Sequence, residues 1–427
     1  MQHHAYKQFQ EDVYTEEMDN GLQVVIIPKQ EFNKTYALFT TKYGSIDNEF
    51  IPMGMKKFVS VPDGIAHFLE HKMFEKEDGD VFQHFSKQGA SANAYTSFTK
   101  TSYLFQASDH IYENLGLLID FVQNPYFTDE TVEKEKGIIA QEIQMYQDNP
   151  DWQLQFALLN NLFPKHPIHI DIAGTVESIQ DITAEDLYMC YDTFYHPSNM
   201  QLVIVGNIDP EIAMAFVRDN QRRKDYIKMP EVRRRFPIEQ AKDIKKGSRM
   251  RMPVSKPKVL VGGRYFGELP SNNKERRKFQ YAALFGLSLL FGNTSRNYNY
   301  WYQSSLIDDS FGFDFNLDRD ICFFSIGGDT EQPERLAQQI EVALFEMSAV
   351  DFSSEKLERL KKKQIGRLIN KMNSLEFIAS HYDEDGDGIT LFDLPAIIES
   401  ITITDVKAVM NQIIDLNAMT KVYMETM

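Results

Sequence analysis

The pentapeptide His67-Phe68-Leu69-Glu70-His71 constrains this chain more than any other feature of its sequence. His67 and His71 are four residues apart, so on a helix their imidazoles lie on one face and can bind the same metal ion. Glu70 borders that face, where its carboxylate can reach a water molecule on the metal. A solvated helix with incidental histidines is the alternative if the pentapeptide stands alone. The rest of the chain must decide between the two.

Composition places the chain among globular proteins with substantial cores. Its 427 residues, 43% of them hydrophobic, suit two or three domains. No segment approaches the roughly 18 consecutive apolar residues of a membrane span, and the N-terminus lacks the apolar stretch of a secretory signal. Cys190 and Cys322 are the only cysteines, too few for a disulfide framework. We therefore expect a cytoplasmic protein with no membrane span.

Charge argues against nucleic acid as a partner, because the formal net charge is -17. One stretch departs from this balance: between Arg222 and Lys258, fourteen Lys or Arg residues stand against four acidic residues. The same stretch is rich in Pro and Gly, which is typical of a linker. Two interpretations stay open. The stretch is either a solvated linker or a strip that docks on an acidic surface, supplied by a partner or by the chain itself.

Strand and helix patterns alternate along the chain in the manner of an α+β protein. The helix that carries the pentapeptide is expected to begin after Pro62-Asp63-Gly64, with Asp63 as its N-cap. Strands are expected at residues 23–28, 35–43 and 94–105, and helices at 112–123 and 129–147.

The two halves of the chain look related. Aligning Ile182-Thr183 with Ile403-Thr404 gives an offset of 221 residues, and in both places a helix and then a strand follow. A duplicated α+β domain explains this better than a solenoid of small units. We expect an N-terminal domain at residues 1–218, a basic linker at 219–258 and a related C-terminal domain at 259–427.

A second helix offers further metal-binding groups. Its stripe at helical spacing is Val132, Glu135, Ile139, Glu142 and Tyr146. Glu135 and Glu142 are seven residues apart and so share a face. Carboxylates in an otherwise apolar stripe are costly unless they are paired or bound to metal. The alternative is that both are solvated.

Several stretches together resemble the pitrilysin/insulinase family of metallopeptidases. The pentapeptide is the inverted form of the zincin motif found in that family. The resemblance covers most of residues 20–210, and the length is similar to the short bacterial and mitochondrial processing type, whose two-domain subunits pair into a clamshell. The matching stretches are Gly64–Phe74, Ser91–Thr96, Glu135–Ile143, Asp148–Asp151, Gly174–Glu177 and His196–Gly206.

This resemblance implies two related α/β-sandwich domains, each an antiparallel-rich sheet with helices on one face, which together form half of a clamshell. It also implies one Zn2+ per chain, held by His67, His71 and Glu142, with the fourth position left for water. Glu70 would act as the general base on that water. Glu135 would support the catalytic centre from beside the metal.

The resemblance further implies how substrate binds. Asn93 and Ala94 lie on a strand that forms a sheet edge in this family, where a peptide adds as an extra strand. Asn93 as a structural strand-end residue is the alternative. The expected substrates are extended or unfolded peptides.

The second half departs from the family pattern. Members usually carry an Arg-Tyr pair that helps to hold the scissile carbonyl, and here Ser305 and Phe311 stand at those positions. The hypothesis that follows is a dimer in which this chain holds the zinc and a second family subunit supplies the pair. A homodimer is the other arrangement.

Taken together, the sequence predicts a zinc endopeptidase or oligopeptidase that cuts peptides in an enclosed chamber. The alternative is a non-catalytic peptide-binding or assembly subunit of the same family. Such subunits tend to lose zinc ligands, whereas His67, Glu70, His71 and Glu142 are all present.

Overall fold

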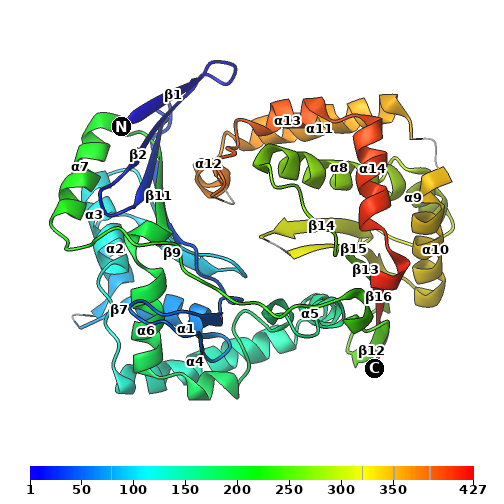
Figure 1. Ribbon diagram of the computed structural model, residues 1–427, viewed down its shortest axis with the longest axis horizontal. Coiled ribbons are helices and arrows are strands. Elements are labelled where there is room, and N and C mark those ends of the chain that lie inside the picture. The colour runs from blue at the N-terminus through cyan, green and yellow to red at the C-terminus, as the bar shows by residue number, and fades with distance from the viewer. Residues whose placement is uncertain (78, 320, 350–351, 384–385) are drawn as a thin grey trace. The chain divides into compact units, whose positions relative to one another are not determined.

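A computed structural model describes residues 1–77, 79–319, 321–349, 352–383 and 386–427. The chain divides into two compact units. Both have a sheet and helices of their own, so the expected mixed α/β fold is confirmed (Figure 1). Unit 1 consists of Met1–Met145, Ile170–Phe236 and Met372–Tyr382, and unit 2 of Tyr146–His169, Pro237–Lys371 and Asp383–Met427.

The sheet of unit 1 has the strand order β1-β2-β3-β11-β4-β10-β9. β3 and β11 run parallel, and every other neighbouring pair is antiparallel. The strands are β1 (Gln2–Tyr6), β2 (Glu11–Glu17), β3 (Gln23–Pro28), β4 (Thr35–Thr41), β9 (Ser91–Thr96), β10 (Thr101–Ala107) and β11 (Met200–Gly206), with the short ribbons β5 (Glu49–Phe50), β6 (Val59–Ser60), β7 (Glu75–Lys76) and β8 (Gly79–Asp80) beside them.

Helices cover one face of this sheet and build the main core of unit 1. Ala37 and Phe39 of β4 and their partners on β11 point to that face, where they pack with apolar residues of α1, α3 and α7. The helices are α1 (Ile65–Met73), α2 (Val81–Lys87), α3 (Ile111–Val122), α4 (Asp129–Gln147), α6 (Ala184–Phe194) and α7 (Pro210–Arg222).

The opposite face of the central strands is apolar too. Leu38 of β4 lies beside Val203 of β11, and both are buried. α12 (Leu375–His381) contacts β4 and β11, and its Ile378 is fully buried. A helix from the C-terminal part of the chain thus completes unit 1, because it shields the apolar side chains on this face of β4 and β11 from water.

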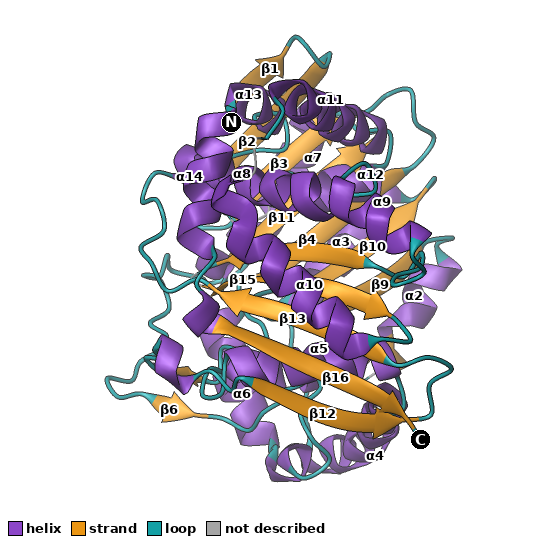
Figure 2. Ribbon diagram, turned by 90° about the vertical axis from the view of Figure 1, so that its right-hand side faces the viewer, coloured by secondary structure: helices purple, strands orange, loops and turns teal. Residues whose placement is uncertain are grey.

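Unit 2 repeats the central part of this topology. Its strand order is β12-β16-β13-β15-β14, again with one parallel pair, β12 and β16, and antiparallel neighbours elsewhere (Figure 2). In the order across the sheet these strands correspond to β3, β11, β4, β10 and β9 of unit 1. They are β12 (Gly247–Met252), β13 (Lys258–Arg264), β14 (Gly312–Asp318), β15 (Ile321–Asp329) and β16 (Met419–Thr426).

The helices of unit 2 include one that precedes the strands in the chain. α5 packs against β12, β13 and β16, although it directly follows α4 in sequence. The helices are α5 (Pro150–Leu162), α8 (Asn273–Phe291), α9 (Arg296–Gln303), α10 (Pro333–Phe345), α11 (Ser354–Lys371), α13 (Leu394–Ser400) and α14 (Ile403–Ile413). The predicted relation between two α/β domains is therefore confirmed at the level of topology.

Matching caps correct the alignment of the two halves. α6 begins with a capping box formed by Thr183 and Asp186, and α14 begins with the same box formed by Thr402 and Asp405. The equivalent residues are therefore Thr183 and Thr402, an offset of 219 residues rather than 221. Isoleucines occur repeatedly near each cap, so the sequence alone can be aligned two residues out of register.

Two local expectations were wrong. The stretch 94–105 is two strands, β9 and β10, because the chain reverses at residues 97–100. The N-cap of α1 is Gly64, with φ of 88°, and the Asp63 side chain instead accepts a hydrogen bond from Asn48. A Cβ at Gly64 would lie 2.3 Å from the Ala173 carbonyl oxygen, so glycine is required where these loops cross.

The expected linker, residues 219–258, contributes to both units, because the second segment of unit 1 ends at Phe236 and unit 2 resumes at Pro237. The domain limits drawn from the sequence remain a prediction. None of the helices in the described part of the chain combines the length and apolar character that crossing a bilayer requires.

Candidate metal centre

The pentapeptide lies on α1, whose other residues bury it against the sheet. Phe68 and Leu69 are fully buried in the core of unit 1, and α1 contacts β9 and β10. His67 and His71 project from one face of the helix, with ring centroids 4.6 Å apart. The helical spacing of the sequence therefore does bring the two imidazoles together.

α4 brings a carboxylate to the same place. Oε1 of Glu142 lies 3.6 Å from Nε2 of His67, and Oε2 lies 3.5 Å from Nε2 of His71. Among the residues that the structure describes, these three side chains form the one cluster of His, Cys, Asp or Glu suited to a metal ion, with ligand atoms within 4.8 Å of one another.

The spacing of these atoms fits zinc. Tetrahedral Zn2+ with bonds of about 2.0–2.1 Å holds its ligand atoms about 3.4 Å apart. The two His–Glu separations of 3.6 and 3.5 Å are close to that value. Two imidazoles and one carboxylate are also a donor set that catalytic zinc uses. The residues present therefore fit the ion that the sequence predicts.

Glu135 contacts this cluster through His71. Its Oε1 is 3.0 Å from Nδ1 of His71, so it accepts the proton of that nitrogen. The bond fixes the tautomer of His71 and leaves Nε2 free to face Glu142. Nδ1 of His67 is buried and has no hydrogen-bond partner within the described residues. Packing rather than a polar partner therefore orients His67.

Burial and charge act differently on the two histidines. Desolvation, helped by nearby His71, lowers the pKa of His67 to about 3. Desolvation also acts to lower the pKa of His71, but the hydrogen bond to Glu135 and the nearby carboxylates outweigh it and raise this pKa. His67 is therefore neutral at physiological pH, which is the form that binds metal.

Glu70 is held from the opposite side by β9. The Thr96 hydroxyl donates to Oε2 of Glu70 over 2.6 Å. Burial raises the pKa of Glu70, whereas the Thr96 bond acts to lower it. Sequence reasoning missed Thr96. The available signal is strand alternation, because Ala94 and Thr96 are two residues apart and so face the same side of β9.

A pocket of about 570 Å³ lies beside Glu70 and His71. It joins the metal cluster to the edge strand β9 and to the β7–β8 ribbon. Its lining includes both candidate substrate-binding residues, Asn93 and Ala94, together with Phe74 and Phe82, whose rings stack at 4.1 Å. Space for a side chain therefore adjoins the candidate centre.

Asn93 and Ala94 lie on the outer strand of the sheet. β9 pairs with β10 on one side and ends the strand order on the other. Asn93 is exposed, and its side chain caps the main-chain N–H of Ala94. An open edge next to the metal cluster is the geometry that strand addition of a peptide needs.

The described residues of unit 2 form no counterpart of this cluster. Lys136 on α4 donates to the carbonyl of Gln180, and Lys361 on α11 donates to that of Ile401, in each case ahead of a capped helix. If these lysines are equivalent, Arg367 takes the place of Glu142 and Leu360 that of Glu135. The ligand set is thus confined to unit 1.

Ser305 and Phe311 occupy the positions at which the Arg-Tyr pair was expected. Both residues lie in unit 2. Ser305 adopts a φ of 54° just after α9, a conformation uncommon outside glycine. Phe311 is buried, and its ring centroid lies 5.7 Å from that of Trp301.

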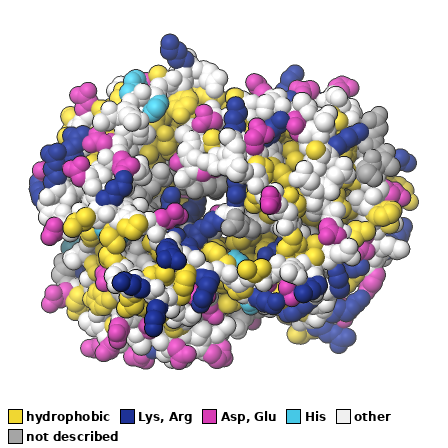
Figure 3. Space-filling model, in the orientation of Figure 1, with side chains coloured by type: hydrophobic (Ala, Val, Ile, Leu, Met, Phe, Trp, Pro, Cys, Tyr) yellow, Lys and Arg dark blue, Asp and Glu magenta, His cyan; other side chains and the backbone are white. Residues whose placement is uncertain are grey.

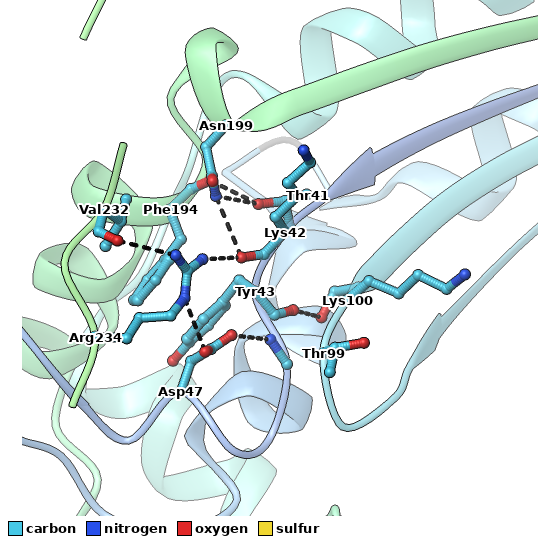
Figure 4. A network of polar contacts seen from close by, with 12 residues as sticks. Thr41, Lys42, Tyr43, Asp47, Thr99, Lys100, Phe194, Asn199, Val232 and Arg234 are labelled. Carbon is cyan, nitrogen blue, oxygen red and sulfur yellow. Dashed lines mark hydrogen bonds and ion pairs between the residues drawn. The ribbon is translucent and has the colours of Figure 1, made fainter. Parts of the chain in front are cut away.

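The basic stretch is largely neutralised by the chain itself. Arg234 forms an ion pair with buried Asp47, and its guanidinium also donates to the carbonyls of Lys42 and Val232 (Figure 4). Within unit 2, Arg249 pairs with Glu425. In the structure, acidic residues of the chain itself therefore provide the surface that the basic stretch contacts.

Basic and acidic side chains are also interspersed over the face shown in Figure 3, so the basic side chains on that face do not form one continuous surface.

Comparison with known proteins agrees with this geometry. Residues 60–176 match the family described as insulinase (peptidase family M16), and residues 181–364 match the peptidase M16 inactive domain. The zinc protease YmfH of Bacillus subtilis, described as uncharacterized, is 51% identical over 413 residues, which is 95% of each chain. The chain therefore belongs to the insulinase family, as its motifs predict.

Solved structures share the fold. An M16-like peptidase from Alicyclobacillus acidocaldarius matches with a TM-score of 0.92 and 36% identity, over 98% of this chain and 99% of that one. The first half of the periplasmic protease PqqL from Escherichia coli matches with a TM-score of 0.74 and 19% identity, over 96% of this chain and 91% of that one. The chain thus has the fold of one half of a longer protease, and the second comparison bears on fold alone.

Proposed function

We propose that this protein is a zinc-dependent peptidase that hydrolyses extended peptides, with its centre in unit 1. The observation that carries the proposal is the convergence of His67, His71 and Glu142 beside Glu70. His67, His71 and Glu142 would hold one Zn2+ per chain. A zinc ion in this setting supplies Lewis acidity, which polarises a peptide carbonyl and lowers the pKa of water to about 7.

The chain's own residues supply the remaining chemistry. Glu70 takes a proton from the attacking water and delivers it to the leaving amine. Because Oε2 of Glu70 accepts the Thr96 hydroxyl, Oε1 is the oxygen available for that proton. Glu135 holds the Nδ1 proton of His71 and thereby keeps Nε2 turned toward the metal. The edge of β9 at Asn93 and Ala94 aligns the peptide main chain.

Substitution of the base tests this proposal. Glu70→Gln keeps the size of the side chain but cannot accept the proton, so we expect zinc to remain bound and cleavage of a quenched fluorescent peptide to fall at least about 100-fold. Zinc content by mass spectrometry and cleavage rate are measured on the same sample. Glu130→Gln, an exposed change on α4, is the control. Cleavage by Glu70→Gln at the wild-type rate would show that the mechanism is wrong.

We also propose that a second family subunit, in a heterodimer, supplies the Arg-Tyr pair, because Ser305 and Phe311 occupy those positions here. A homodimer is the alternative arrangement. Purification of the chain from its native source identifies what binds it. Full peptidase activity of the purified chain without a partner would contradict the heterodimer.

The competing function is a non-catalytic peptide-binding or assembly subunit. The description of the matched segment 181–364 as an inactive domain favours it. Retention of Glu70 argues against it, because binding zinc or peptide does not require a base. We further propose a reducing compartment, the cytoplasm, because Cys190 and Cys322 are both free and buried.

A further inference from the structure

We propose that Thr96, backed by Thr101, is a positioning residue for Glu70: its hydroxyl holds the carboxylate in the orientation in which it exchanges protons. This inference deepens the proposed peptidase function and rests on it. In this proposal β9 positions the catalytic base, a role separate from pairing with the substrate main chain.

The first support is the isolation of Glu70 from other donors. Glu70 is 8% exposed, so few water molecules reach its carboxylate. Among the residues that the structure describes, the Glu70 side chain makes one hydrogen bond, from the Thr96 hydroxyl over 2.6 Å. A buried carboxylate without a donor is costly, so this bond largely determines where the side chain rests.

The second support is the direction of the bond. An ionised carboxylate only accepts hydrogen bonds, so the Thr96 hydroxyl must donate its single proton to Glu70. Thr101 Oγ1 lies 3.3 Å from the Thr96 oxygen, directly across the β9–β10 pair in register. Thr101 is fully buried and donates its single hydroxyl proton to the carbonyl oxygen of Tyr43 over 2.9 Å. Thr101 therefore supports Thr96 by packing against it, not by donating a hydrogen bond.

The third support is a rigid setting behind the two threonines. Tyr103 lies two residues from Thr101 on β10, and its hydroxyl is 2.7 Å from that of Tyr195 within the core. The turn between β9 and β10 is fixed as well, because the N–H of Ser45 donates to the carbonyl of Ser97 over 3.0 Å. Hydroxyls in such a packed network have few alternative rotamers, so they can hold a partner in place.

The loop that carries Tyr43 is anchored in turn by the basic stretch. Asp47 accepts from the N–H of Gly44 over 2.9 Å and from Nε of Arg234 over 2.9 Å (Figure 4). The rings of Tyr43 and Phe194 stack at 4.0 Å in the same region. A connected set of contacts therefore runs from Arg234 through this loop to Thr101, Thr96 and Glu70.

The test compares Thr96→Val with Thr96→Ser. Valine keeps the shape of threonine but has no hydroxyl, whereas serine keeps the hydroxyl. For Thr96→Val we expect kcat to fall about 10- to 100-fold with KM changed less than about twofold, because a misplaced base slows the reaction without weakening binding. For Thr96→Ser we expect at least about a third of the wild-type kcat. Zinc content should match wild type in both variants.

Thr40→Val is the matched control, because Thr40 pairs with Ser102 on the same sheet and does not contact Glu70. Its kcat should equal that of wild type. In the Glu70→Gln background, Thr96→Val should cause no further loss, since both changes act on one group. Equal losses in Thr96→Val, Thr96→Ser and Thr40→Val would indicate a purely structural role and overturn the proposal.

A readout that does not depend on turnover completes the test. Crystal structures of the zinc-loaded variants should show Glu70 in its original place in Thr96→Ser and displaced or in several rotamers in Thr96→Val. A single unchanged position of Glu70 in Thr96→Val overturns the inference. Failure of the peptidase proposal is separate, because it would appear as full activity of Glu70→Gln.

Discussion

The two histidines of the pentapeptide are related by sequence spacing but held by different forces. His71 is fixed by a hydrogen bond from its Nδ1 to Glu135, whereas the buried Nδ1 of His67 has no partner in the described part of the chain. Desolvation keeps His67 neutral with a pKa of about 3. One ligand is thus oriented by a carboxylate and the other by packing, although both occupy the same helix face.

The ion pair between Arg234 and Asp47 is expected to contribute to the free energy of unfolding, and this contribution can be measured. The Asp47 side chain has no exposure and that of Arg234 has 12%. Arg234→Ala removes the guanidinium that neutralises a buried carboxylate, so we expect the free energy of unfolding to fall by about 3–5 kcal/mol. Urea denaturation followed by circular dichroism measures the change.

The neighbouring residue provides the control for this prediction. Arg235 pairs with Glu49, but its side chain is 57% exposed. Arg235→Ala should cost less than about 1 kcal/mol, because solvent screens exposed ion pairs. Equal losses for the two variants would show that burial does not distinguish them.

How far individual residues can be predicted depends on whether their contacts are local. His67, Glu70 and His71 are grouped by helical spacing. The stripe on a second helix singles out Glu135 and Glu142 together, and the family resemblance is what favours Glu142 as the ligand. Thr96 was not predicted, because its contact with Glu70 joins a strand to a helix 26 residues earlier. Strand alternation places Thr96 on the same side of β9 as Ala94, but the pairing of Thr96 with Glu70 is specified only once the sheet and the helix are placed.

Elements with a strong local signal were predicted well. The helix expected at 129–147 is α4, Asp129–Gln147, and the strand expected at 23–28 is β3, Gln23–Pro28. The hairpin of β9 and β10 was read as one strand, because residues 97–100 are Ser-Phe-Thr-Lys and contain neither Gly nor Pro. The Ser97 hydroxyl instead makes the turn by accepting from the N–H groups of Thr99 and Lys100, and a single serine is a weaker turn signal than Gly or Pro.

α12 is the element whose placement could least be predicted, and its role can be tested. Ile378→Ala truncates a fully buried side chain above β4 and β11. We expect a loss of about 2–5 kcal/mol and weaker hydrogen-exchange protection in β4 and β11, because these strands lose packing on one face. Hydrogen exchange with mass spectrometry locates the effect.

The matched change is Ile369→Ala on α11, where the side chain is 48% exposed. It should leave the protection of β4 and β11 unchanged. Unaltered protection in the Ile378→Ala protein would mean that α12 does not stabilise those strands.

At the scale of the whole molecule, bound zinc should stabilise the fold. An ion that binds the folded chain about 1,000-fold above its dissociation constant adds about 4 kcal/mol to the free energy of unfolding. Chelation should therefore lower the melting temperature, and added zinc should restore it. In Glu142→Gln this zinc-dependent shift should largely disappear, as calorimetry can measure. A shift of wild-type size in that variant would exclude Glu142 as a ligand.

The chain passes between the two units at residues 145, 169, 236, 371 and 382. Sequence reasoning identified the duplication from two similar stretches that each precede a helix and a strand, and the contiguous domain limits drawn from it remain a prediction. It could not show that α5 follows unit 1 residues yet belongs to unit 2, because both helices flanking that boundary have ordinary amphipathic patterns.

The position of α12 in the chain has a consequence for synthesis on the ribosome. Protein chains generally fold from the N-terminus as they emerge. Residues up to Arg222 supply the sheet of unit 1, but Met372–Tyr382 supplies the helix that covers β4 and β11. That apolar surface stays open while about 150 further residues are translated. We therefore expect a nascent chain of this protein to need protection by chaperones until Met372–Tyr382 has emerged from the ribosome.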